Sequence, residues 1–184
     1  MKTLTGCLCL MLLFYSRTVP AQIYTPRDNG SSVQFIIKNL GFNVEGTFTH
    51  LQGSIHFDTD NLAAAGFTVT VDAATVSTGN SSRDSHLKKE EYFNVAKYPL
   101  ISFSSEKIEK SATAGSYIAT GKFTVKGKSK PVSIGFTASK QENGYLFKGK
   151  VTLNRRDFGV GGNSFVLSDN LILIMNVFSL SDKK

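Results

Sequence analysis

The sequence contains few of the residues from which catalytic and metal sites are built. It has two cysteines, three histidines and no tryptophan among 184 residues. His50 and His56 are six residues apart across a predicted turn, a spacing that does not direct both rings at one metal ion. The chain also lacks a Gly-x-Ser-x-Gly segment to present a nucleophilic serine. We therefore predict that the protein is not an enzyme, holds no metal and requires no cofactor.

Residues 1–21 differ in character from the rest of the chain. Lys2 precedes an apolar run from Leu8 to Tyr15, and Val19-Pro20-Ala21 follows that run. A basic start, an apolar stretch and small residues in this order are typical of a cleaved secretory signal peptide, and the run is too short to anchor in a bilayer. We predict cleavage after Ala21 and a periplasmic or secreted protein. Both cysteines lie in the removed segment, so the mature chain is expected to fold without disulfides.

The formal charge of +7 is spread along the chain, and loss of Lys2 and Arg17 with the signal peptide lowers it to +5. Scattered basic residues are typical of solvated outer faces and turns, and they permit transient contact with an anionic membrane surface. No segment interleaves basic and aromatic residues in the way that nucleic-acid-binding motifs do. We therefore exclude nucleic acid as the partner.

Apolar and polar residues alternate through most of the chain after residue 30. Alternation places successive side chains on opposite faces of a sheet, so each segment predicts a strand with one dry and one wet face. Fourteen phenylalanines make the dry faces rich in phenyl rings. The predicted strands are residues 31–39, 44–51, 53–57, 67–72, 101–108, 117–125, 129–139, 145–154 and 170–180.

The alternation stops at residues 83–93, where charged residues gather on one side and predict the one short helix, capped by one of residues 80–82. Lys126-Gly127 and Asn143-Gly144 predict tight turns between neighbouring strands. The glycines of residues 159–162 suit a bulge or a corner before the last strand. About eight antiparallel strands joined in this way leave no open edge when they close. We therefore predict an all-β, eight-stranded antiparallel barrel with one short helix.

Six segments are informative through their order and spacing. They are Val33-x-Phe35-x-Ile37-Lys38, Val44-Glu45-Gly46-Thr47-Phe48, Arg83-Asp84-x-His86-Leu87, Tyr92-Phe93-x-Val95-x-Lys97-Tyr98-Pro99-x-Ile101-x-Phe103, Gly121-Lys122-Phe123-Thr124-Val125-Lys126-Gly127 and Arg156-Asp157-Phe158-Gly159-Val160-Gly161. Together they resemble the YceI-like family of exported bacterial proteins over residues 31 to about 180. The resemblance implies one lipocalin-like barrel domain over residues 22–184. It also implies that the barrel sequesters a long isoprenoid chain, such as a polyprenyl lipid or the tail of an isoprenoid quinone.

The resemblance and the alternation together give candidate binding residues. The family often has histidine after the basic residue of the first strand, where this chain has Asn39 after Lys38, and an amide cannot become cationic near neutral pH as an imidazole can. We predict an apolar tunnel that opens near residues 83–93 and is lined by Phe35, Ile37, Phe48, Phe67, Val69, Phe103, Phe123, Phe136, Phe147 and Val151. The residues predicted to meet a polar headgroup are Asn39, Arg83, Lys88 and Arg156.

Two other interpretations stay open from the sequence. In the first, the phenyl rings fill the interior, and the barrel, as a monomer or homodimer, binds another exported protein through an outer apolar patch. The out-of-phase apolar residues that would form this patch are Ile36, Ile118, Ile172, Ile174, Phe178 and Leu180. In the second, the protein acts on a lipid with a polar cluster inside the barrel, for which the candidates are Asn39, Arg83, Asp84 and Arg156.

The intact mass of the exported protein tests the predicted processing. Because cleavage is expected after Ala21, the mass should equal that of a chain beginning at Gln22. A mass that retains Cys7 with attached acyl chains would contradict this prediction and identify a lipoprotein instead.

Overall fold

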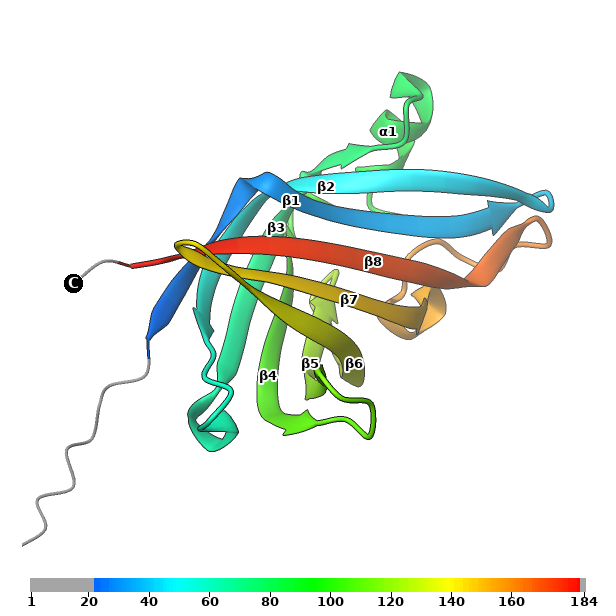
Figure 1. Cartoon of the computed structure of the whole chain (residues 1–184). Coiled ribbons are helices and arrows are strands. Elements are labelled where there is room, and N and C mark those ends of the chain that lie inside the picture. Colours follow the sequence, from blue (N-terminus) through cyan, green and yellow to red (C-terminus); the bar gives the residue numbers. More distant parts are fainter. Residues whose placement is uncertain (1–21, 183–184) are drawn as a thin grey trace, which may run out of the picture.

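The structure is a computed structural model that describes residues 22–182, which form one closed barrel (Figure 1). The predicted signal peptide and its cleavage point lie outside these residues. The strands are β1 (Ile23–Asn39), β2 (Phe42–His56), β3 (Gly66–Ser77), β4 (Leu100–Lys110), β5 (Ser116–Val125), β6 (Lys128–Gln141), β7 (Gly144–Asn154) and β8 (Leu167–Ser181). Each strand is antiparallel to the next, and β8 pairs with β1, which confirms the predicted eight-stranded barrel.

Three short helices lie in the connections: η1 (Leu62–Ala64), α1 (Ser81–Leu87) and η2 (Arg155–Phe158). Of these, α1 is the single α-helix of the described residues, as the sequence predicts. Within residues 22–182, no helix has the length and apolar character needed to cross a membrane.

Antiparallel pairing sends alternate connections to opposite ends of the barrel. One end, here called the α1 end, carries residues 40–41, 78–99, 126–127 and 155–166. The other end, here called the terminal end, carries the start of β1, the end of β8 and residues 57–65, 111–115 and 142–143. In Figure 1 the terminal end of β1 and β8 lies at the left, and the β1–β2 turn lies at the right beside the segment that leads into β8.

The predicted dry faces point into the barrel. Along β5, the five residues of the predicted inner face are all buried, and they alternate with exposed or half-buried neighbours. They are Tyr117, Ala119, Gly121, Phe123 and Val125. The register predicted from the alternation is therefore confirmed, because a slip by one residue would have exchanged the two faces.

The predicted strands 44–51 and 53–57 are one continuous strand, β2. The pairing of β2 with β3 shifts register between Thr49 and Gln52, and His50 and Gly53 both have positive φ, 57° and 130°. A side chain on Gly53 would collide with the Thr68 carbonyl oxygen of β3. The glycine therefore marks a bulge at which the strand bends without ending, rather than a turn between two strands.

The first strand also begins earlier than predicted, at Ile23 instead of residue 31. Its pairing with β8 is interrupted between Arg27 and Ser32, where Gly30 has a φ of 85°. The Asp28 carboxylate within this bulge accepts hydrogen bonds from the backbone N–H groups of His50 (3.1 Å) and Leu51 (2.8 Å) in the β2 bulge. One side chain thus replaces the backbone ladder where two bulges face each other.

The predicted helix 83–93 is too long, because α1 ends at Leu87. It begins at Ser81, two residues earlier than predicted. Asn80, one of the predicted caps, is the cap, and its side chain accepts a hydrogen bond from the Arg83 N–H at 3.0 Å. Beyond Leu87 the chain folds as turns, with a φ of 50° at Asn94. Positions six apart in a helix point about 120° away from each other, whereas the turns bring Leu87 and Phe93 to the same cavity.

Replacing Asp28 by alanine should destabilise the barrel. The change removes the acceptor of two backbone hydrogen bonds at the facing bulges, so the free energy of unfolding is expected to fall by about 1–2 kcal/mol in urea titrations. Asp60→Ala is the matched control, because Asp60 is an exposed turn residue, and it should change stability by less than about 0.5 kcal/mol. Equal stability of the two variants would contradict the bridging role of Asp28.

Candidate functional site

Aromatic side chains fill the half of the barrel nearest the terminal end. Phe57, from the β2–β3 connection, is 2% exposed and lies edge-on to the rings of Tyr117 and Phe147, with centroid distances of 5.2 Å to each. Burial raises the pKa of the Tyr24 and Tyr145 hydroxyls at this end above that of an exposed tyrosine. We call this cluster the plug. Its members are Tyr24, Phe57, Phe67, Tyr117, Phe136, Tyr145 and Phe147.

The other half of the barrel holds a cavity of about 170 Å³. Along β1 its wall runs from Val33 to Asn39. Six residues of strand rise roughly 20 Å, which is roughly 15 Å along the axis of a barrel with ordinary strand tilt. The cavity is therefore a blind tunnel, closed by the plug at one end and bounded by the connections of the α1 end at the other.

Six of the ten residues predicted to line the tunnel do so, and four do not. Those on the cavity wall are Phe35, Ile37, Phe48, Val69, Phe103 and Phe123. Phe67, Phe136 and Phe147 face inward but belong to the plug, because each packs against another ring at 5.2–5.3 Å. Val151 is half-buried on the inner face of β7 and lies outside this wall. The rest of the wall includes aliphatic residues such as Leu153, Leu171, Leu173, Met175 and Val177.

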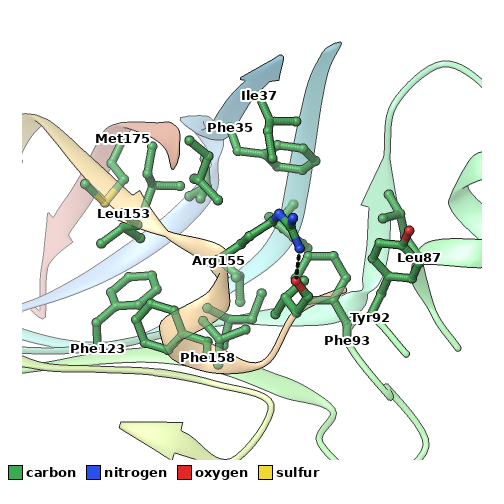
Figure 2. Close-up of a pocket in the computed structure, with 18 of the residues that line it drawn as sticks. Phe35, Ile37, Leu87, Tyr92, Phe93, Phe123, Leu153, Arg155, Phe158 and Met175 are labelled. Atoms are coloured by element: carbon green, nitrogen blue, oxygen red, sulfur yellow. Dashed lines mark hydrogen bonds between the residues drawn. The ribbon is translucent and has the colours of Figure 1, made fainter. Parts of the chain in front are cut away.

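The α1–β4 connection covers the mouth of the tunnel. Leu87, Tyr92 and Phe93 line the cavity from this side, and Phe93 meets the ring of Phe48 edge-on at 5.4 Å (Figure 2). By contrast, α1 has no buried residue and stands away from the barrel in Figure 1. The cover is therefore formed by Tyr92 and Phe93 of the turn segment together with Arg83 and Leu87 of α1.

The cover is fastened to the β7–β8 connection by one backbone hydrogen bond and by the Lys126 side chain. The Gly161 N–H donates to the Glu91 carbonyl oxygen at 2.9 Å. The Lys126 ammonium joins the two segments, because it donates to the carbonyl oxygens of Glu91 (3.2 Å) and Gly159 (2.8 Å). These three contacts join the cover to the segment that leads into β8.

Two of the four residues predicted to meet a headgroup line the cavity, namely Asn39 and Arg83. Arg83 is tied to Thr78, since its Nε donates to the Thr78 hydroxyl at 2.7 Å and its Nη2 donates to the Thr78 carbonyl oxygen at 3.0 Å. Its Nη1 makes no hydrogen bond within residues 22–182 and can therefore donate to a ligand. Lys88 and Arg156 lie outside the cavity wall.

The arginine that does reach the cavity from η2 is Arg155, the neighbour of the predicted Arg156. Its side chain is 2% exposed and forms an ion pair with Asp169 at 2.8 Å. Its remaining N–H groups donate to five backbone carbonyl oxygens at 2.9–3.3 Å, those of Val160, Gly161, Gly162, Leu167 and Ser168. Figure 2 shows the guanidinium among apolar side chains of the wall. Because its donors are all engaged, Arg155 shapes the mouth and does not present hydrogen bonds to a ligand.

The strand alternation contains the signal that identifies Arg155. Phe147, Val151 and Leu153 lie on the inner face of β7, and one further step of two residues reaches Arg155. Leu153 is the last apolar residue of this face, and because an arginine is rarely buried, apolar alternation alone does not predict that Arg155 continues it. Burial is tolerated here because the β7–β8 connection turns its carbonyl groups toward the guanidinium.

The other two interpretations find less support in the geometry. Ile36, Ile172 and Ile174 are neighbours on the outer faces of β1 and β8, whereas Ile118 lies across the barrel on β5, so the six residues do not form one patch. Within residues 22–182, no group of three or more His, Cys, Asp and Glu side chains is placed to hold a metal ion. Asp84, a candidate for a lipid-modifying cluster, accepts hydrogen bonds from the backbone and hydroxyl of Thr78.

Comparisons with known proteins give one consistent result. Residues 24–178 match the sequence profile of the YceI-like domain. A UPF0312 protein of Yersinia enterocolitica is 31% identical over 185 residues, which cover 96% of this chain and 95% of that protein. The crystal structure of a Campylobacter jejuni YceI protein has a TM-score of 0.68 at 28% identity, covering 78% of this chain and 87% of that one.

Two more distant structures share the fold. BcnA of Burkholderia cenocepacia has a TM-score of 0.78 at 23% identity, covering 83% of this chain and 98% of its own. A domain from Saccharophagus degradans, described as polyisoprenoid binding and implicated in plant cell wall breakdown, has a TM-score of 0.68 at 12% identity. That match covers 86% of this chain and 98% of the domain.

Replacing Arg155 by lysine should destabilise the protein more than the same change at Arg156. A lysine offers three donors from one nitrogen and leaves several of the five carbonyl groups without a partner, so unfolding should become easier by about 2–4 kcal/mol in urea titrations. Arg156→Lys should cost no more than about 0.5 kcal/mol, because its side chain is 42% exposed. If the two variants are equally stable, Arg155 does not organise the mouth.

Proposed function

This chain belongs to the YceI-like family, and we propose that it binds the hydrocarbon chain of an isoprenoid lipid inside its barrel. The observation that carries the proposal is the blind tunnel, whose wall is mostly aliphatic and aromatic and whose mouth lies under the α1–β4 connection. A slender apolar chain fits a tunnel of this shape, whereas a bulky or highly polar ligand does not. Either a polyprenyl lipid or the tail of an isoprenoid quinone would supply such a chain.

The fold comparison supports an isoprenoid as the ligand class. The Saccharophagus degradans domain, described as polyisoprenoid binding, shares the fold over almost its whole length. At 12% identity this comparison shows a shared barrel fold only. We propose the same ligand class for this chain because its barrel also has an apolar wall.

The volume of the tunnel sets how much of the lipid the observed state can hold. An engineered cavity of about 150 Å³ accommodates one benzene ring, so a cavity of about 170 Å³ accommodates roughly one five-carbon isoprene unit. Burying one such unit contributes about 2–4 kcal/mol, which corresponds to millimolar affinity at best. Tight binding therefore requires several units, and the interior must widen to admit them.

The parts of the wall that can move lie at the mouth and on β8. Met175 has a flexible side chain that can change rotamer without disturbing the barrel. The α1–β4 connection is held by only a few hydrogen bonds, chiefly those to Glu91 and from Lys126. We propose that the lipid enters by displacing this connection, and that the plug stays fixed and ends the tunnel.

A polar headgroup would remain near the mouth. Arg83 offers an Nη1 donor there, and the Asn39 amide can both donate and accept a hydrogen bond. Because Asn39 does not titrate, it would hold a neutral headgroup equally well over a broad pH range, unlike a histidine.

We also propose that the protein works outside the cytoplasm, after cleavage following Ala21, and that it binds its lipid without altering it. Among the polar residues on the wall, Arg155 and Arg83 are engaged in holding the connections of the α1 end. This use of charged groups is structural, which supports binding rather than catalysis.

Two phenylalanine-to-tryptophan substitutions distinguish a barrel that holds a lipid from a barrel whose interior is completely filled by side chains. Phe123→Trp adds volume next to the cavity, so it should abolish co-purification of lipid while changing the melting temperature little. Phe136→Trp is the matched control in the plug, where added volume should overpack the interior and lower stability by about 1–3 kcal/mol while lipid is retained. Native mass spectrometry with lipid extraction measures the first effect, and thermal unfolding measures the second.

The proposal fails if the wild-type protein from its native host carries no lipid and Phe123→Trp is as destabilised as Phe136→Trp. That outcome would mean that the α1 end is packed as tightly as the plug.

A further inference from the structure

Four large apolar side chains are exposed together at the α1 end of the barrel. Leu40 lies in the β1–β2 turn, Phe42 begins β2, and Phe165 and Val166 precede β8. Phe42 is 78% exposed and Phe165 is fully exposed. The Leu40 N–H donates to the Val166 carbonyl oxygen at 2.8 Å, so the two loop tips are joined. We call these four residues the rim.

The rim is a cluster and not ordinary surface scatter. Within residues 22–182 seven large hydrophobic residues are exposed, and four of them form the rim. The other three, Ile23, Leu100 and Ile118, lie on three different strands. Single exposed apolar residues need no explanation, but two exposed phenylalanines on adjoining loop tips do.

The rim borders the mouth of the tunnel. Asn39 and Leu167 line the cavity, and they are the immediate neighbours in sequence of Leu40 and Val166. Any surface that covers the rim therefore also faces the opening of the tunnel.

Charge is divided between the two ends of the barrel. The connections of the α1 end carry seven basic and four acidic residues, whereas those of the terminal end carry three acidic residues and no basic one. The basic residues of these α1-end connections are Arg83, Lys88, Lys89, Lys97, Lys126, Arg155 and Arg156. Arg155 is buried and paired with Asp169, so the other six are the ones that can face an anionic surface. The strand ends do not add to this difference, because Lys38 and Lys128 flank the α1 end and Lys110 and Lys140 flank the terminal end.

We propose that the α1 end docks on a lipid bilayer that contains anionic lipid, with the rim inserted among the headgroups and the basic residues around it. Aromatic and aliphatic side chains surrounded by basic ones are the arrangement that binds such a surface. A second copy of the chain is a poorer occupant of the rim, because it would bring two basic ends together. The inference rests on the proposed function, since docking gives a lipid a dry path between bilayer and tunnel.

Tryptophan fluorescence reports insertion directly, because the chain has no native tryptophan. Phe165→Trp should show a blue-shifted emission when vesicles of phosphatidylcholine and phosphatidylglycerol are added, and the shift should weaken with salt and with vesicles of phosphatidylcholine alone. Ile118→Trp is the matched control on the outside of β5, and its emission should not change. Equal responses of the two variants, or no response of Phe165→Trp, would overturn the proposal.

A second variant tests the rim without a probe. Phe42→Ser combined with Phe165→Ser should weaken co-sedimentation with the anionic vesicles by at least about tenfold and leave the melting temperature unchanged, because both side chains are exposed. Wild-type binding by this variant contradicts the proposal. The proposal is also contradicted if the wild-type protein forms a dimer without vesicles and the double variant is a monomer, since the rim would then bind a second copy.

Lipid bound inside the barrel is measured separately by native mass spectrometry. Vesicle binding by a protein that carries no lipid overturns the proposed function and leaves the docking surface standing. A protein that carries lipid but does not bind vesicles contradicts the docking proposal and leaves the proposed function unaffected.

Discussion

Pairing of β1 with β8 closes the sheet, and the other features of the interior depend on that closure. An eight-stranded barrel is just wide enough to be filled by its own side chains, so the size of each inward residue decides whether space remains. At the terminal end, phenyl and phenol rings meet around Phe57 and leave none. Toward the α1 end, residues such as Leu171 and Leu173 occupy inward positions, and these smaller side chains line the cavity instead of filling it.

A tunnel with one packed end needs a mouth that keeps its shape, and Arg155 provides this. Burying a guanidinium is costly unless its donors are satisfied, and the β7–β8 connection satisfies them with carbonyl groups, of which those of Val160 and Gly161 accept in buried hydrogen bonds. Charge and backbone stabilise each other here. Gly161 allows the arrangement, since a side chain at that position would crowd both Arg155 and Tyr92.

The two-residue alternation was sufficient to predict the barrel and which face of each strand points inward. It could not predict where the tunnel stops, because Phe123 and Phe136 occupy equivalent inward positions. Only the packing of Phe57, which enters from a connection, assigns one ring to the cavity and the other to the plug. The alternation also includes Arg155, but it does not predict that this arginine is buried. Its burial depends on carbonyl groups from the β7–β8 connection, a segment without a repeating pattern.

The connections are where local sequence signals were least reliable, because tertiary contacts decide their shape. The run from Lys88 to Glu91 has good helix formers, yet α1 ends before it because Tyr92 and Phe93 are partly buried against the barrel. The free energy of covering the mouth outweighs a few tenths of a kcal/mol of helix propensity per residue. The proposed entry of a lipid depends on the same balance. Apolar contact with the cavity holds Tyr92 and Phe93 in addition to the hydrogen bonds at Glu91, and a lipid chain in the tunnel would offer those side chains an alternative apolar surface.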